Sequence, residues 1–121
     1  MSQKIPPWLA EKIKAYQQTQ TNMQNIQMQL QRIELDTQNT KKALEILEKT
    51  PDDRAVYKEA GSIMVQSDKT TLKDYLEEEQ ELLKTQVAVL TKQSKRIEDT
   101  LREQEAGINQ AIQGGAMNPG S

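Results

Sequence analysis

The side chains that most often carry out chemistry in proteins are scarce in this chain of 121 residues. It contains no histidine and no cysteine, so the commonest general base and the thiolate metal ligands are both missing. Carboxylates cluster at residues 52–53 and 77–79, where a solvated turn and the beginning of a helix explain them. Two glycines at 114–115 follow a helical pattern without a nearby lysine, unlike a phosphate-binding loop. We therefore expect a protein that is not an enzyme and has no cofactor or metal site.

Composition limits the possible partners in the same way. The formal net charge is −2, which leaves no basic field for binding the phosphates of nucleic acid. No apolar run reaches the length of a membrane span, and residues 1–7 lack the apolar core of a signal peptide. The absence of cysteine fits a reducing compartment. We expect a cytoplasmic protein without a nucleic-acid or membrane partner.

Two long segments repeat apolar residues every three or four positions, which predicts helices over about 7–49 and 69–113. The first helix should begin near Pro6 and Pro7 and end before Pro51, because proline disfavours helical geometry in the preceding residue. Asp68 is a good N-cap for the second helix. Chains of this pattern fold back as an antiparallel two-helix coiled coil. The fold class is therefore mainly α.

The spacing of the apolar residues also predicts which side chains face the partner helix. In the first helix, two successive three-residue spacings at Met23 and Ile26 indicate a local overwinding of the supercoil. The expected seam of this helix is Leu9, Ile13, Tyr16, Gln20, Met23, Ile26, Leu30, Ile33, Thr37, Thr40, Leu44 and Leu47. In the second helix, one row is Leu76, Leu83, Leu90, Ile97 and Gln104, and the other is Gln80, Val87, Ser94, Leu101 and Ile108.

Residues 55–67, between the two helices, favour strands and predict one central β-hairpin that turns at Gly61 and Ser62. The alternative is a plain loop between helices. An isolated hairpin is marginally stable in water and presents unpaired edges, and this chain has no further strands to offer. We therefore expect the hairpin to join an intersubunit β-sheet or barrel. Its oligomerisation residues would be Val56, Tyr57, Gly61, Ile63, Met64 and Val65.

Several segments together resemble the β-type subunit of archaeal prefoldin over nearly the whole chain. They are the Ile5-Pro6-Pro7 start, Tyr16-Gln17-Gln18, Lys42-Ala43-Leu44-Glu45, and above all Asp52-Asp53 followed by Val56-Tyr57-Lys58 and Gly61. The resemblance implies one β-type domain over residues 1–121, with a flexible tail at 114–121. It implies an ATP-independent holding chaperone in which two α-type and four β-type subunits form a hexamer with a double β-barrel. The coiled-coil ends would bind unfolded proteins and pass them to a group II chaperonin.

Both ends of the chain should meet at the end of the coiled coil far from the hairpin. Apolar side chains at a frayed helix end stay partly exposed and can bind other apolar surfaces. Linked weak contacts from several subunits would add up to useful avidity. Trp8 is the leading candidate, and the full set of expected client-binding residues is Ile5, Trp8, Leu9, Ile13, Ile108, Ala111 and Ile112.

Two other functions fit parts of the same pattern. A structural or adaptor coiled coil would bind one specific folded partner and ignore unfolded proteins. A coiled-coil arm that binds RNA would need a stripe of lysine and arginine. The basic residues near the end of the second helix alternate with Glu98, Asp99 and Glu103, so no such stripe forms.

Overall fold

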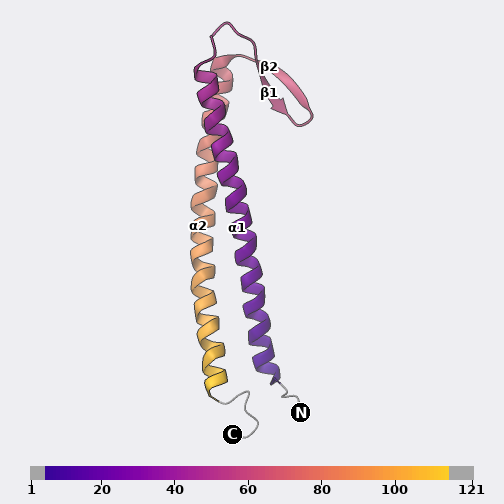
Figure 1. Ribbon diagram of the computed structural model, residues 1–121, viewed down its shortest axis with the longest axis vertical. Helices are drawn as coiled ribbons and strands as arrows, with labels where there is room; N and C mark the ends of the chain where they lie inside the picture. Colours follow the sequence, from indigo (N-terminus) through magenta and orange to yellow (C-terminus); the bar gives the residue numbers. More distant parts are fainter. Residues whose placement is uncertain (1–4, 115–121) are drawn as a thin grey trace. The chain divides into compact units, whose positions relative to one another are not determined.

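The computed structural model describes residues 5–114 and contains two helices and two strands in the order α1, β1, β2, α2 (Figure 1). Helix α1 spans Pro7–Glu48 and helix α2 spans Lys69–Gln113, while strands β1 and β2 span Val56–Ala60 and Ile63–Ser67. The expected fold class is confirmed: two long antiparallel helices with one central β-hairpin. Of the expected tail at 114–121, residues 115–121 lie outside the described residues.

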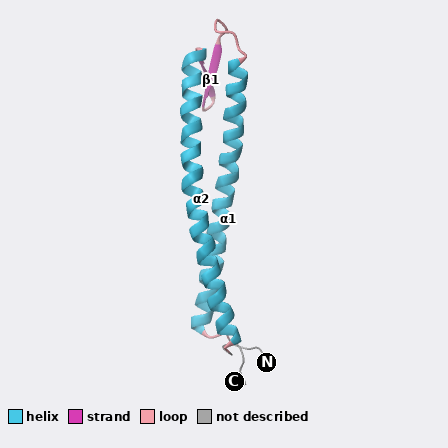
Figure 2. Cartoon of the chain, turned by 90° about the vertical axis from the view of Figure 1, so that its left-hand side faces the viewer, coloured by secondary structure: helices cyan, strands magenta, loops and turns pink. Residues whose placement is uncertain are grey.

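The chain divides into two compact units, and each contains a segment of both helices. Unit 1 comprises residues up to 29 and from 90 onward, and unit 2 comprises residues 30–89 with the whole hairpin. Within unit 2, the last turns of α1 and the first turns of α2 lie side by side, and the hairpin leaves from the segment that joins them (Figures 1 and 2). No helix in the described residues is apolar enough over a sufficient length to cross a membrane.

The end of α1 follows from the chemistry of residues 50 and 51. The Thr50 amide donates to the Leu47 carbonyl at 3.0 Å, and its hydroxyl donates to the Ile46 carbonyl at 2.8 Å. These bonds satisfy carbonyl groups that have no helical partner at a C-terminus. Pro51 cannot continue the helix. The helix therefore ends at Glu48, and a short turn leads to the hairpin.

The beginning of α2 depends on Asp68, the predicted N-cap. One carboxylate oxygen accepts from the Thr71 amide at 2.8 Å, and the other accepts from the Thr71 hydroxyl at 2.8 Å. The Thr71 amide and then the Thr71 hydroxyl hold the pKa of Asp68 below its ordinary value, because both stabilise the charged carboxylate. An N-cap of this kind fixes the helix start directly after β2.

The β-hairpin is antiparallel and two residues, Gly61 and Ser62, form its turn. Gly61 has φ of 63°, and no non-glycine residue in the described part of the chain has a positive φ. A positive φ at the first of two turn residues is the pattern of a type II′ turn, which matches the twist of the strands. The Cα partners are Val56 with Ser67, Tyr57 with Gln66, Lys58 with Val65, Glu59 with Met64 and Ala60 with Ile63.

The cores of the two units run along the predicted helix seams. Leu47 and Leu83 are buried in unit 2, together with Thr40, whose hydroxyl donates to the Asp36 carbonyl at 2.8 Å. Leu9, Ile26 and Leu90 are buried in unit 1. Every residue of the two rows predicted for α2 is buried or half-buried, so the seven-residue spacing identified this face correctly.

The seam of α1 differs from the prediction at one position. Gln20 is exposed, and its neighbour Thr19 is half-buried in its place. The two successive three-residue spacings therefore fall at Ile13, Tyr16 and Thr19 rather than at Met23 and Ile26. The Thr19 hydroxyl donates to the Ala15 carbonyl of its own helix at 2.9 Å. It can therefore be half-buried in the seam at little cost, whereas the Gln20 amide is more stable in water.

Candidate protein-binding and assembly surfaces

The hairpin presents apolar side chains on both of its faces. Alternation along the strands places Val56, Ala60, Ile63 and Val65 on one face and Tyr57 and Met64 on the other. Tyr57, Ile63, Met64 and Val65 are all exposed within this chain, up to 65% for Met64. The hairpin is a two-stranded sheet with exposed apolar side chains on both faces.

One contact from the middle of β1 reaches the flank of α2. The Lys58 Nζ lies 3.6 Å from the ring centre of Tyr75, a cation–π geometry. Lys58 shares its hairpin face with Val56, Ala60, Ile63 and Val65, so this face is directed toward α2 at that level. The contact holds the hairpin beside the helix and leaves exposed both Val65, the cross-strand partner of Lys58, and Ile63, which lies nearer the turn.

The junction between the hairpin and the helices is rich in charge. The Lys69 Nζ donates to the Glu48 carbonyl at 3.3 Å and lies 3.2 Å from an Asp52 carboxylate oxygen. This amine therefore occupies the C-terminus of α1, where a positive charge is favourable. Lys73 pairs weakly with the Glu48 carboxylate at 3.9 Å. Among the described residues, no group of acidic side chains has the arrangement of a metal site, and these charges bind one another.

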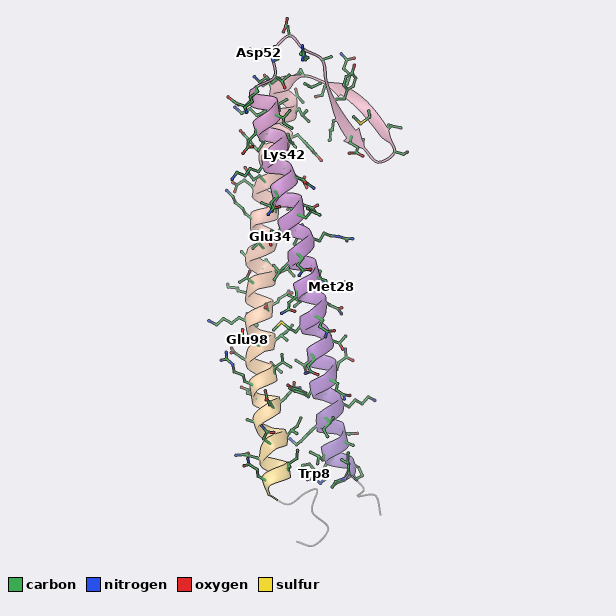
Figure 3. All side chains as sticks on the ribbon, in the orientation of Figure 1. Trp8, Met28, Glu34, Lys42, Asp52 and Glu98 are labelled. Carbon is green, nitrogen blue, oxygen red and sulfur yellow. The ribbon has the colours of Figure 1, made fainter. Side chains whose placement is uncertain are left out.

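The opposite end of the chain's helices, in unit 1, carries the residues expected to bind clients. Figure 3 shows Trp8 in the first turn of α1. Trp8 is 50% exposed, Ile5 is 43% exposed and, near the end of α2, Ile112 is 46% exposed. Ile13, Ile108 and Ala111 are half-buried. Among these expected client-binding residues, the exposed ones lie just before or within the first turn of α1 and in the last turn of α2, while other exposed apolar side chains lie along the helices.

Leu9 departs from the expectation of partial exposure. It is fully buried, the most completely enclosed apolar side chain in the described residues. Its place in the heptad pattern explains this, because Leu9 begins the seam that continues through Ile13 and Tyr16. Trp8, one residue earlier, is rotated about 100° around the helix and so faces outward. Leu9 is thus the first core residue of α1, next to the exposed Trp8.

A hollow of about 320 Å³ lies between the two helices of unit 1, about one turn inward from Trp8 on α1. Its lining residues are Lys12, Ala15, Glu103, Gln104 and Gly107. Sequence reasoning missed Lys12, Ala15 and Gly107 as surface-forming residues. Gly107 could have indicated this surface from the sequence. Glycine inside a helix costs about 1 kcal/mol relative to alanine, so a glycine there often has a packing or functional role.

A family model described as prefoldin subunit matches residues 10–115 of this chain. The chain belongs to the prefoldin subunit family. The prefoldin β subunit of Methanothrix thermoacetophila is 34% identical over 119 residues, which cover 98% of each chain. The prefoldin β subunit of Thermococcus kodakarensis is 32% identical over 110 residues, covering 91% of this chain and 94% of the relative.

A solved structure gives the same result for the fold. The crystal structure of the prefoldin β subunit from Thermococcus strain KS-1 matches with a TM-score of 0.76 and 31% identity, covering 98% of this chain and 99% of that one. The resemblance to archaeal β-type prefoldin, inferred from the central motif, is therefore confirmed. Members of the prefoldin family are chaperone subunits that form hetero-oligomers with one another, and the family is not one of known enzymes.

Proposed function

We propose that this chain is a β-type subunit of a holding chaperone that works without ATP. Its substrates are non-native polypeptides, which bind at the end of unit 1 formed by the first turn of α1 and the last turns of α2. The observation that carries the proposal is the exposure of Trp8, Ile5 and Ile112 at this end, where Leu9 is buried. Apolar side chains held in water by a rigid core bind other apolar groups without requiring a defined shape.

The hairpin supports the oligomer that such weak binding needs. A single small apolar patch holds a partner only weakly, whereas several linked patches act at a high effective concentration. The exposed apolar residues on both faces of the hairpin favour assembly with other hairpins into a shared barrel. We propose the arrangement of two α-type and four β-type subunits, in which four copies of this chain each contribute one binding end.

The proposed holding function also implies a next step for the bound polypeptide. A holding chaperone without a nucleotide site has no chemical step with which to refold its substrate. We propose that the substrate passes to a group II chaperonin in the cytoplasm. In this proposal, the binding and transfer rest on apolar contacts and charge.

The test compares two positions of equal exposure on the assembled oligomer. Trp8 is 50% exposed at the proposed binding end, and Leu82 is 51% exposed on the flank of α2 in unit 2. Trp8→Ser combined with Ile112→Ser should reduce the suppression of aggregation of a chemically denatured test protein several-fold. Leu82→Ser should leave it unchanged. Light scattering at 360 nm during dilution from denaturant gives the readout, and chromatographic mass confirms that the oligomer is intact.

Two results would contradict the proposal. If Trp8→Ser with Ile112→Ser suppresses aggregation as well as the unaltered oligomer, the binding end is not where we place it. If the unaltered oligomer ignores every denatured test protein yet captures one folded protein, the chain is a structural or adaptor coiled coil instead.

A further inference from the structure

A row of apolar side chains on the outer side of α2 begins at the contact between this helix and the hairpin. Its members, Tyr75, Leu82 and Val89, follow one another at seven-residue intervals and therefore share one face of the helix. They are 38%, 51% and 50% exposed. The Lys58 Nζ lies 3.6 Å from the ring centre of Tyr75, the first member of the row. The row is one of two apolar surfaces that meet at Lys58.

The second surface is the hairpin face on which Lys58 itself lies. Val65 is the cross-strand partner of Lys58, and Ile63 is on the same face nearer the turn. They are 46% and 61% exposed. Both the hairpin and α2 extend from the junction at Asp68, and the turn of the hairpin stands away from the helices (Figure 1). The two apolar surfaces thus form the sides of an open angle, and the Lys58 side chain crosses it.

The charge of Lys58 opposes the closure of this angle. Packing Ile63 and Val65 against Leu82 would remove apolar area from water, which is favourable by itself. The ammonium between the two surfaces would then lose its water without gaining a carboxylate, which is unfavourable. None of the four salt bridges among the described residues includes Lys58. The charge therefore lies where it makes closure most costly.

We propose that Lys58 is a spacer, a positioning residue that keeps the hairpin face of Ile63 and Val65 off its own helix and open to a neighbouring prefoldin subunit. The proposal rests on the proposed function, in which the hairpin joins a shared barrel. The Tyr75 ring attracts the ammonium and holds the hairpin beside α2. The same charge prevents the apolar contact that would follow further along the helix. One side chain thus sets both limits of the distance.

Spin labels on the full, unassembled chain measure the angle directly. Because the sequence contains no cysteine, Ser62→Cys in the turn and Thr85→Cys, at an exposed position of α2 beyond Leu82, provide two unique labelling sites. Double electron–electron resonance should give a shorter distance for Lys58→Met, which replaces the charged side chain with an uncharged one. The matched control, Lys58→Arg, keeps the charge and should keep the distance of the unaltered chain. An unchanged or longer distance in Lys58→Met would overturn the spacer.

A second substitution in the Lys58→Met chain tests where the hairpin comes to rest. Leu82→Ser removes the apolar group on which the closed hairpin would pack, and should restore the distance of the unaltered chain. The control is Leu35→Ser, the same change at a leucine of α1 that is 56% exposed, which should leave the distance short. A short distance that persists in Lys58→Met with Leu82→Ser would overturn the proposed closed state.

Closure should also slow the formation of the oligomer. Mixed with an α-type prefoldin subunit, Lys58→Met should assemble several-fold more slowly than the unaltered chain, as followed by light scattering. Lys58→Arg, and Lys58→Met combined with Leu82→Ser, should assemble at close to the unaltered rate. Assembly of Lys58→Met at the unaltered rate would overturn the role of the spacer in assembly.

These results separate the spacer from the function on which it rests. If the unaltered chain assembles and suppresses aggregation while the hairpin of Lys58→Met stays open, the spacer is wrong and the proposed function stands. If the unaltered chain does not assemble with an α-type subunit, the proposed function itself fails, whatever distance the labels give.

Discussion

Single side chains determine where the helices of this chain begin and how much each core contributes to stability. Asp68 is the clearest case, because both of its carboxylate oxygens are bonded to Thr71 at the start of α2. Burial also differs sharply between neighbours: Leu83 is 4% exposed, whereas Leu82 is 51% exposed. Residues adjacent in sequence therefore contribute very different amounts to stability.

Asp68 should make the stability of the chain depend on pH in the acid range. Its pKa is held below the ordinary value of 3.8, so its stabilising effect is complete above that value and is lost as pH falls through the lowered pKa. Asp68→Ala should melt at a lower temperature than the unaltered chain at pH 7. That difference should shrink as the pH is lowered below 3.8.

Thermal melts followed by circular dichroism at a series of pH values measure this difference. The control is Asp53→Ala, which removes an exposed carboxylate from the loop before the hairpin. A difference between Asp68→Ala and the unaltered chain that stays constant from pH 7 to pH 3 would show that the cap acts without its charge.

Leu83→Ala should lower the free energy of unfolding by about 2–5 kcal/mol, because it leaves a cavity in the core of unit 2. Leu82→Ala removes the same atoms from the outer flank and should change it by less than about 0.5 kcal/mol. Urea denaturation of the two variants, followed by circular dichroism, measures both values. Similar losses would mean that Leu82 is covered in the assembled protein.

At the scale of elements, the sequence predicted most of the helical structure because its signal is periodic. The seven-residue rows of α2 appear as buried or half-buried positions without exception. The signal failed where two adjacent residues are both polar: Gln20 and Thr19 are equally poor core residues by type, and only packing selected Thr19. Leu9 was expected both in the seam and among the client-binding residues, and its burial agrees with the seam position.

The hairpin was predictable from residue types, but its surroundings were not. Branched residues and Gly61 indicated two strands and a turn, and the structure has them. The contact between Lys58 and Tyr75 joins residues that are separated by the second strand, and no local pattern reports such a pair. The same limit applies to the hollow at Gly107, whose walls come from the two ends of the sequence.

Gly61→Ala tests the turn as an element. A Cβ at this position meets no atom within 4 Å, so any cost comes from the backbone, whose φ of 63° disfavours alanine. We expect a loss of about 1–2 kcal/mol in the stability of the assembled oligomer. Gly61→Asn should lose less, since asparagine adopts this conformation more readily.

Guanidinium denaturation of the oligomer measures both losses, with Ser62→Ala as the control in the same turn. Ser62 has a negative φ, which alanine accepts. Equal midpoints for Gly61→Ala and Ser62→Ala would show that the turn changes its type without penalty.

At the scale of the whole molecule, the central question is how copies of this chain join other prefoldin subunits. The face of the hairpin that carries Val56, Ala60, Ile63 and Val65 has the larger number of apolar side chains, and Lys58 directs it toward α2. We expect this face to pack inside the assembly. The other face combines Tyr57 and Met64 with Glu59 and Gln66 and should tolerate polar change better.

Val65→Asp should therefore prevent assembly, because it places an unpaired charge among apolar side chains. Gln66→Asp adds the same charge one residue later on the opposite face and should leave assembly intact. Light scattering during chromatography, with a co-expressed α-type prefoldin subunit, gives the mass of each product. Normal assembly of Val65→Asp would exclude this face from the interface, and failure of both variants would place both faces within it.

The apolar side chains on both faces of the hairpin have a further consequence for the cell that makes this protein. A newly synthesised copy that has not found its partners exposes Tyr57, Ile63, Met64 and Val65, the same kind of surface that marks a damaged or unfinished protein. Surplus copies should therefore compete with other clients for completed oligomers. If the proposed holding function is correct, overproduction of one subunit would lower the number of free binding ends, and balanced synthesis of the subunits would preserve them.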